Sequence, residues 1–506
     1  MTNRARRSGL SPLLLLPGLT GGFLPGLACS PPPAGGPAGL PGQQLDARAA
    51  DGDPGGRDGA TAGDLGRATP DAQPDRDGGG DDGAGGRDGG GGGGGGGDHG
   101  GDGGGGAGDG GGDGEDGGGA NAGGALDGSW PQDGYTIRIE QAEWPQVHLH
   151  YRLQGQGWTP LPGAAMQREG GSWWSGRTPP GRLLEFVFND GGDRWYPGGA
   201  ANNLLTGWPA VHVRDGLIFT HHPDLPRPPG ELVVLTVNLH TYQEQEAAAK
   251  LDRVADTIAA LRADFVCFQE CAQHSGAAVM QDPAAFSPFA GEPIRADNMA
   301  RLITDRLRAV HGATYRYAWS WAHHGWNVWE EGVAVLTPHP ILEQEQRYVS
   351  TQRGTGTIDS RKAVYLAAQL PDLGRLHVFS AHTSWGQDQE VQIRNLKAFL
   401  AEKAGAAAPL ASLLCGDFNA PAGQQGHALL VSPEGGRLVD TYLEANPGHG
   451  ADPTMPGDGT RIDYIFYAEG APLQTRTAQI YFKHHPLLGG RVSDHFGQVS
   501  RLGLRR

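Results

Sequence analysis

The sequence is poor in cysteine and in long apolar runs. Four of its 506 residues are cysteines: Cys29, Cys267, Cys271 and Cys415. The last three include at least one unpaired thiol, so no disulfide scaffold is expected. They form no CxxC pair, the commonest spacing of structural zinc sites. Cys267 and Cys415 lie inside apolar runs and are predicted to be buried as small hydrophobic residues.

Aromatic residues are absent from residues 31–129, where glycine and acidic residues accumulate. Residues 31–130 hold 42 glycines, 18 acidic residues and five arginines, a charge of −13 out of the net −16. Such a segment cannot bury enough apolar surface to offset its ordering entropy. The sequence therefore predicts a disordered Gly/Asp-rich linker over 30–129. With +3 on the first 30 residues, residues 131–506 carry only −6, which excludes one strongly acidic globule.

Residues 1–29 have the pattern of an export signal. Three arginines, at 4, 6 and 7, precede a short apolar run that ends in Ala28-Cys29. The run is too short to span a bilayer as a helix. Its end resembles a bacterial lipoprotein signal, which implies lipidation of Cys29 and a membrane anchor at the outer membrane or cell surface. Gly26 replaces the usual aliphatic residue of that pattern, and cleavage after Ala28 with release as a secreted protein stays open.

Residues 130–228 predict a small antiparallel β-sandwich. Three runs alternate apolar and polar residues or are continuously apolar, at 135–139, 147–151 and 183–188, and Gly/Pro clusters separate them. Seven tryptophans between residues 130 and 208 exceed the needs of a small core. Aromatic faces of this kind stack on the apolar faces of sugars, although packing in the core remains the alternative for each of them.

The same segment resembles starch-binding modules of carbohydrate-binding families twenty-five and twenty-six. The resemblance lies in His150-Tyr151, Trp158-Thr159 and Phe186–Asp190 followed by Trp195. It implies binding of a starch-like α-glucan, with sugar contacts at His150, Trp158 and Trp195. The sequence departs from these families after Trp195, where Tyr196-Pro197-Gly198-Gly199 replaces an Asp-Asn-Asn run.

Residues 229–506 alternate strands and helices, which predicts an α+β domain. Apolar runs typical of buried strands lie at 232–238, 265–269, 332–336, 376–380, 412–415 and 462–466. Helical periodicity favours helices near 251–261, 299–310 and 388–403. Polar residues stand at or just past the strands, and we expect them to converge at one edge of a sheet: Asn238, Glu270, His382, Asp417, Asn419 and Asp463.

Seven segments of this domain resemble the endonuclease/exonuclease/phosphatase superfamily in the family order. They are Val237-Asn238-Leu239, Phe268-Gln269-Glu270, Glu331–Leu336, Ser380–Thr383, Gly416-Asp417-Phe418-Asn419, Arg461–Ile465 and Ser493-Asp494-His495-Phe496. The resemblance implies the DNase I-like fold, a four-layer sandwich of two mixed β-sheets flanked by helices. It also implies hydrolysis of phosphodiesters by an activated water, without a covalent intermediate.

The resemblance implies a metal site of oxygen ligands from Glu270, Asn238 and Asp494. Such a donor set suits Mg²⁺ or Mn²⁺ better than zinc. His495 is implied as the base that activates the water, held by Asp463.

On the phosphate side of the site, the resemblance pairs His382 with Glu331. Asp417 and Asn419 are implied to position the water and stabilise the transition state. Arg361 is expected on the substrate side. Asp440 is open to two interpretations, a helix cap or a residue that supports the site.

The substrate is less well defined by the sequence. Residues 319–329 contain four tryptophans and are expected to form a loop beside the cleft, where they stack bases, enter a lipid interface or pack under the sheet. The signature of inositol-polyphosphate phosphatases is missing. We expect an exported, monomeric nuclease; a sphingomyelinase-like phospholipase and a catalytically silent glycan-binding surface protein are the alternatives.

Overall fold

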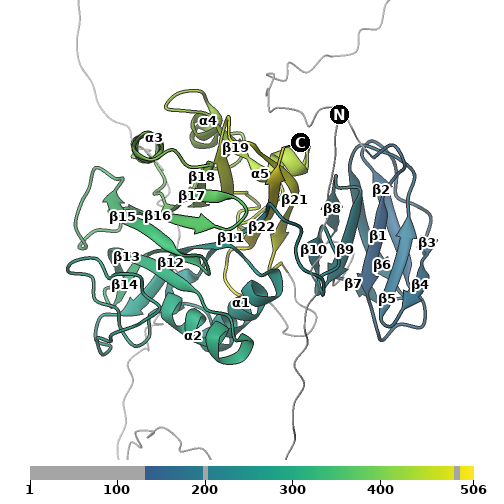
Figure 1. Ribbon diagram of the computed structural model, residues 1–506, viewed down its shortest axis with the longest axis horizontal. Helices are drawn as coiled ribbons and strands as arrows, with labels where there is room; N and C mark the ends of the chain where they lie inside the picture. The colour runs from purple at the N-terminus through teal and green to yellow at the C-terminus, as the bar shows by residue number, and fades with distance from the viewer. Residues whose placement is uncertain (1–130, 198–202, 387, 484–490, 506) are drawn as a thin grey trace, which may run out of the picture. The chain divides into compact units, whose positions relative to one another are not determined.

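The computed structural model describes residues 131–197, 203–386, 388–483 and 491–505 (Figure 1). The export signal, Cys29 and the Gly/Asp-rich linker lie outside these residues, so their predictions are not tested by the structure. Within the described ranges, no helix is both long and apolar enough to cross a membrane.

The first described segment forms two β-sheets around one core. One sheet has the strand order β10 (Leu217–Phe219), β9 (Ala210–Arg214), β1 (Thr136–Glu140), β5 (Trp173–Arg177) and β4 (Gln167–Gly170). The other has the order β3 (Ala164–Ala165), β2 (His148–Leu153), β6 (Leu184–Asn189) and β7 (Trp195–Tyr196), with β8 (Leu204–Thr206) also paired to β6. Both sheets contribute to the core, through residues such as Ile137, Leu149 and Phe186.

The remaining strands form two six-stranded mixed sheets. The first has the order β13 (Arg316–Gly325), β14 (Trp329–Thr337), β12 (Phe265–His274), β11 (Glu231–Asn238), β22 (Gly497–Leu504) and β21 (Leu473–Tyr481). The second has the order β15 (Ile341–Tyr348), β16 (Lys362–Leu370), β17 (Gly374–His382), β18 (Ala411–Asp417), β20 (Asp463–Ala468) and β19 (Leu438–Asp440). Neighbours β11 and β12 are parallel, as are β17 and β18.

The two sheets pack face to face, which explains why the central strands are apolar on both sides. In β11, Leu232 and Val234 point into the core between the sheets, whereas Val233, Leu235 and Val237 belong to the core under the helices. Because side chains alternate along a strand, a strand covered on both faces has no polar side.

Helices cover the two outer faces. α1 (Ala247–Leu261) and α2 (Met299–His311) contribute to the core outside the first sheet, and α3 (Gln389–Ala406) and α4 (Gln425–Val431) to the core outside the second (Figure 1). The 3₁₀ turn η1 (His240–Tyr242) and the short α5 (Thr441–Ala445) complete the helical elements of the described chain. The predicted four-layer arrangement is confirmed.

Six strands of these sheets are absent from the predicted set: β13, β15, β16, β19, β21 and β22. The predicted loop at 319–329 is wrong, because most of it forms the hairpin of β13 and β14. Trp319 is only 3% exposed there and donates from Nε1 to the Cys271 carbonyl at 2.7 Å. The predicted burial of Cys267 and Cys415 is confirmed, and Cys271 is buried as well.

Asp440 is a helix cap and also the partner of a buried cation. Its Oδ1 accepts from the backbone N–H groups of Tyr442 and Leu443, at 2.9 and 3.2 Å. Its Oδ2 lies 2.8 Å from Arg461 Nη2 and 3.1 Å from His427 Nε2. Burial opposes the charge, but Arg461 and His427 hold the pKa of Asp440 well below its ordinary value. The residue therefore stabilises the fold beside the site.

We predict that Asp440→Asn keeps the cap and removes the charge that pairs with Arg461, whose side chain is fully buried. An unpaired buried cation costs about 3 kcal/mol of unfolding free energy at pH 7. A carboxyl with a depressed folded pKa contributes stability above its unfolded pKa and loses it as the pH falls.

The deficit of Asp440→Asn is therefore expected to be about 1 kcal/mol smaller at pH 3 than at pH 7. Urea unfolding at both pH values measures it, with the exposed Asp372→Asn as control. A deficit that is independent of pH contradicts the ion-pair role.

Candidate active site

Three strands of the second sheet place three of the predicted catalytic residues in one row. His382 ends β17, Asp417 ends β18 and Asp463 begins the antiparallel β20. In the register, His382 pairs with Asp417 and Asp417 with Asp463. The hydrogen-bonded pairing of the three strands therefore places these three residues side by side, as we predicted from their positions at strand ends.

The Gly-Asp-Phe-Asn segment folds into a close turn after β18. Gly416 has a φ of 149°, and a Cβ there would lie 1.9 Å from the carbonyl oxygen of Ala381 on β17. Only glycine fits this approach. Asn419, two residues after Asp417, has a φ of 47°. Its backbone N–H donates to Asp417 Oδ1 at 2.9 Å, and its side-chain amide donates to the Thr383 carbonyl at 2.8 Å. The turn thus fixes both Asp417 and Asn419.

His495 lies between two carboxylates. Its Nδ1 donates to Asp463 Oδ2 at 2.9 Å, and its Nε2 is 3.7 Å from Asp417 Oδ2. The contact of His495 with Asp463 is the pairing that the family resemblance implied. Burial lowers the pKa of His495, but Asp463 and Asp417 outweigh it and raise that pKa well above its ordinary value. Burial also raises the pKa of Asp417, to about 6, and Asp463 adds to the effect.

Asn238 joins this group to a second cluster of carboxylates. Its amide nitrogen donates to Glu270 Oε1 at 2.8 Å and to Asp417 Oδ2 at 3.1 Å. Its Oδ1 accepts the backbone N–H of His240 at 2.9 Å. The prediction of Asn238 as a direct metal ligand does not fit this geometry, because the amide presents its N–H and not its oxygen to the carboxylates.

Glu270 lies in a bulge inside β12, where the sequence had predicted a strand end. The register with β14 shifts between Phe268 and Cys271, and Glu270 adopts a φ of 48°. The extra residue turns the side chain towards Asn238. Burial and the neighbouring Glu331 raise the pKa of Glu270 to about 8. The surrounding protein groups therefore do not fully compensate the negative charge of ionised Glu270.

Glu331 pairs with His323 and not with His382, so that predicted pair is wrong. Glu331 Oε1 is 3.1 Å from His323 Nε2, and its Oε2 accepts from the Thr241 hydroxyl at 2.8 Å. His323 is 1% exposed, and its Nδ1 lies 3.0 Å from the Ser360 carbonyl. The sequence interpretation missed His323 because β13 was not predicted; the alternation of Tyr317, Trp319 and Trp321 was the available signal.

His382 faces an arginine instead. Arg361 Nη1 lies 3.2 Å from His382 Nδ1, and the amide nitrogen of Asn419 lies 3.2 Å from Nε2. Burial lowers the pKa of His382 well below its ordinary value and Arg361 lowers it further. His382 is therefore neutral at pH 7. Arg361 is placed beside the predicted catalytic residues, as expected for a group on the substrate side.

Asp494 lies at a more open part of the site. Its Oδ1 accepts from the Ser493 hydroxyl at 3.0 Å and is 3.5 Å from His240 Nδ1, and its side chain is 35% exposed. His240 also contacts Glu244 Oε1 at 2.8 Å. The sequence interpretation did not include His240 and Glu244, which lie on or just after η1 and carry no periodic signal.

A protein-family model matches the part of the chain that contains this site. The model of the endonuclease/exonuclease/phosphatase family matches residues 235–495, more than half of the chain. The chain belongs to this family. Members of the family are phosphodiesterases and phosphatases that generally depend on a divalent metal. Comparison with curated proteins gave no match.

Solved structures of the family resemble the chain at low identity. A family protein from Leptotrichia buccalis C-1013-b is 25% identical, with 53% of this chain and 98% of that chain covered and a TM-score of 0.43. A family protein from Beutenbergia cavernae DSM 12333 is 21% identical, with 54% of this chain and 72% of that chain covered and a TM-score of 0.40. The human Nocturnin catalytic domain with bound sulfate is 16% identical, with 55% of this chain and 96% of that chain covered and a TM-score of 0.39.

The donor set of this family member fits a divalent cation. Ligand atoms of Glu270, Glu331 and His382 lie within 4.8 Å of one another. Asp463 is fully buried, and its Oδ1 has no hydrogen-bond partner. Buried carboxylates with so few cationic partners require an ion or a proton. Oxygen ligands of this type suit Mg²⁺ or Mn²⁺.

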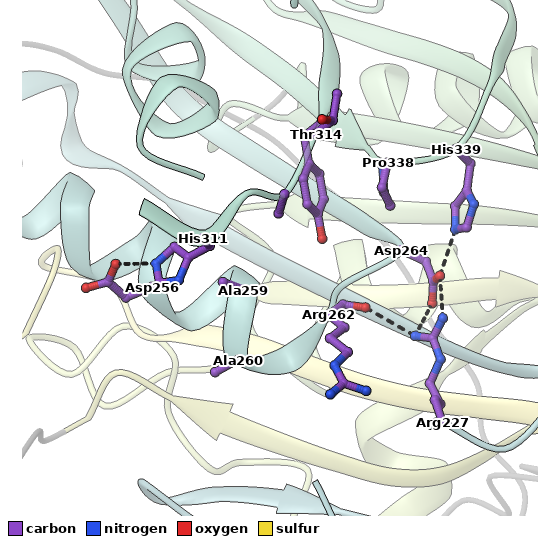
Figure 2. Close-up of a pocket in the computed structure, with 12 residues that line it drawn as sticks. Arg227, Asp256, Ala259, Ala260, Arg262, Asp264, His311, Thr314, Pro338 and His339 are labelled. Carbon is purple, nitrogen blue, oxygen red and sulfur yellow. Dashed lines mark hydrogen bonds and ion pairs between the residues drawn. The ribbon is translucent and has the colours of Figure 1, made fainter. Parts of the chain in front are cut away.

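The cavity shown in Figure 2 is not part of this site. Its volume is about 650 Å³, and Arg227, Asp264 and His339 line it together with the ends of α1 and α2. Most of its ionic groups are paired with one another, including Arg227 with Asp264 at 2.6 Å and His311 with Asp256 at 2.7 Å. None of the predicted catalytic residues lines it.

The three predicted sugar contacts lie together, His150 on β2, Trp195 on β7 and Trp158 in the loop that follows β2. The rings of His150 and Trp158 stack with centroids 4.8 Å apart, and Trp195 meets His150 edge-on at 5.7 Å. All three side chains are partly exposed. His150 Nδ1 is 3.1 Å from the Thr159 hydroxyl, which fixes the ring.

Proposed function

We propose that the protein is a metal-dependent phosphodiesterase that hydrolyses nucleic acids by water attack. The observation that carries the proposal is the convergence of Glu270, Asp417 and His495 around Asn238 at one end of the paired sheets. In a member of this family, such a group has the residue types that phosphodiester hydrolysis needs.

His495 is the proposed base. Its Nδ1–H is held by Asp463, so in the neutral imidazole Nε2 is the nitrogen that takes a proton from a water located against Asp417. The carboxylates that raise the pKa of His495 also stabilise the imidazolium that forms. Asp417 and the amide of Asn419 orient that water, because the turn after β18 holds both.

Arg361 and His382 are the proposed contacts to the phosphoryl group. Arg361 is always cationic and is 2% exposed, so its charge acts in a medium of low dielectric. His382 is neutral and serves as a hydrogen-bonding group, not as a source of positive charge. Glu270 and Asp494 would hold a divalent cation, which would neutralise the charge that develops on the phosphoryl oxygens.

The β-sandwich is proposed to bind a starch-like α-glucan through His150, Trp158 and Trp195. Stacked and edge-on rings at a partly exposed sheet face support it, since sugars bind through their apolar faces. The proposed location is outside the cytoplasm, anchored through lipid at Cys29 or secreted after cleavage.

We predict that the full chain cleaves plasmid DNA or RNA with Mg²⁺ and that a chelator abolishes the cleavage. His495→Ala is expected to lower kcat by about 10²–10⁴-fold. His311→Ala, which removes a partly exposed histidine of the Figure 2 cavity, is the matched control and retains activity. Sphingomyelin and a chromogenic phosphodiester complete the substrate panel.

Each other outcome of this substrate panel contradicts one part of the proposed function. Cleavage of sphingomyelin alone supports the phospholipase alternative, and no turnover of any substrate supports a silent glycan-binding protein. Cleavage that survives in His495→Ala rejects the proposed base.

For the sandwich, we predict retarded migration of the protein in gels that contain soluble starch or glycogen. Trp158→Ala is expected to weaken the apparent affinity about 5- to 10-fold, because a stacked ring contributes about 1–1.5 kcal/mol. Trp173→Ala, on β5 of the other sheet, is the matched control. No retardation of the unsubstituted protein in either polysaccharide contradicts the proposal.

A further inference from the structure

Two exposed tryptophans lie at the rim of the active site. Trp326 is 45% exposed and Trp385 is 59% exposed, and both are among the most exposed large apolar side chains of the described residues. By contrast, Trp319 and Trp174 are buried at 3% and 6%. Large aromatic rings are usually covered, so two that are open beside one site point to a ligand.

Trp326 stands beside the open, carboxylate side of the site. It occupies the turn between β13 and β14, where it and Asn327 have φ values of 46° and 60°. Its ring meets the His240 ring edge-on, with centroids 6.4 Å apart. His240 in turn is 3.5 Å from Asp494. One intermediate residue therefore separates this ring from the proposed metal carboxylate.

Trp385 stands beside the cationic side of the site. It follows β17, three residues after His382, and precedes Gly386, which has a φ of 86°. Its ring centroid is 5.9 Å from Arg361 Cζ. Arg361 contacts His382. This ring is likewise adjacent to a proposed catalytic group, so the two tryptophans border different parts of the same cluster.

We infer that Trp326 and Trp385 stack on unpaired bases on the two sides of the scissile phosphate, which makes single-stranded nucleic acid the preferred substrate. The inference rests on the proposed function. Bases present their faces to aromatic rings only when they are not stacked in a duplex, and stacking of this kind tolerates any base.

A nucleic acid fits this rim better than a lipid surface. The two rings come from separate loops, and each contacts the imidazole or guanidinium group of a site residue. A membrane-inserting segment needs a continuous apolar face, whereas Val328, 40% exposed beside Trp326, is the single exposed large apolar side chain within three residues of either tryptophan in the described chain.

The test uses the full chain with an unlabelled 12-nucleotide single strand, the same sequence as a duplex, and sphingomyelin vesicles. In the presence of a chelator, isothermal titration calorimetry follows binding without turnover. We expect the single strand to bind and to quench the tryptophan fluorescence of the unsubstituted protein, and Trp326→Ala/Trp385→Ala to weaken binding about 100-fold. The expected factor is about 10-fold for each ring. Trp326→Phe/Trp385→Phe is expected to restore most of the affinity.

With Mg²⁺, the double alanine variant is expected to raise KM for the single strand and to lose its preference over the duplex. Val310→Ala, which removes a 53% exposed side chain on α2, is the control and retains both values. Unchanged affinity for the single strand in the double variant overturns the inference, and so does loss of vesicle binding alone. If the protein binds the strand through the tryptophans but cleaves nothing, the proposed function fails while the stacking inference stands.

Discussion

The structure of the site depends on an excess of buried carboxylates at one end of two packed sheets. Glu270, Glu331, Asp417 and Asp463 meet there, and burial and mutual repulsion raise the pKa values of Glu270 and Asp417 to about 8 and 6. Such a group is tolerated only if neighbours supply protons, hydrogen bonds or cations. Asn238 bridges two of the carboxylates, and His495 lies between Asp417 and Asp463. A divalent cation, on which this family generally depends, would compensate the remaining negative charge.

Strand register and a few special backbone positions hold that cluster together. His382, Asp417 and Asp463 are neighbours because β17, β18 and β20 pair in that register. Gly416 allows β18 to approach β17, and the bulge at Glu270 turns a strand residue towards the cluster. Backbone strain of this kind persists where the surrounding structure determines it, as both covered faces of these sheets do here.

Much of this arrangement could be predicted from the sequence, because a strand that is apolar on both faces must lie between two layers and its polar end must lie at an edge. The four layers and the grouping of Asp417, Asp463 and His495 follow from that pattern and from the family motifs. The partners of Glu331 and the orientation of Asn238 could not be predicted. Both depend on contacts between distant segments, such as His323 on β13 and the backbone of His240. Which tryptophans of residues 319–329 are exposed likewise depends on the hairpin pairing.

The most direct test is the binding of Mn²⁺ to the full chain, followed by electron paramagnetic resonance. One tightly bound ion per chain is expected, and Glu270→Gln is expected to weaken its binding at least 10-fold, because the variant removes a ligand and a negative charge. Glu434→Gln, at an exposed position on the surface, serves as the control. Absence of a tightly bound ion, or unchanged affinity in Glu270→Gln, would contradict a divalent cation held by the buried carboxylates.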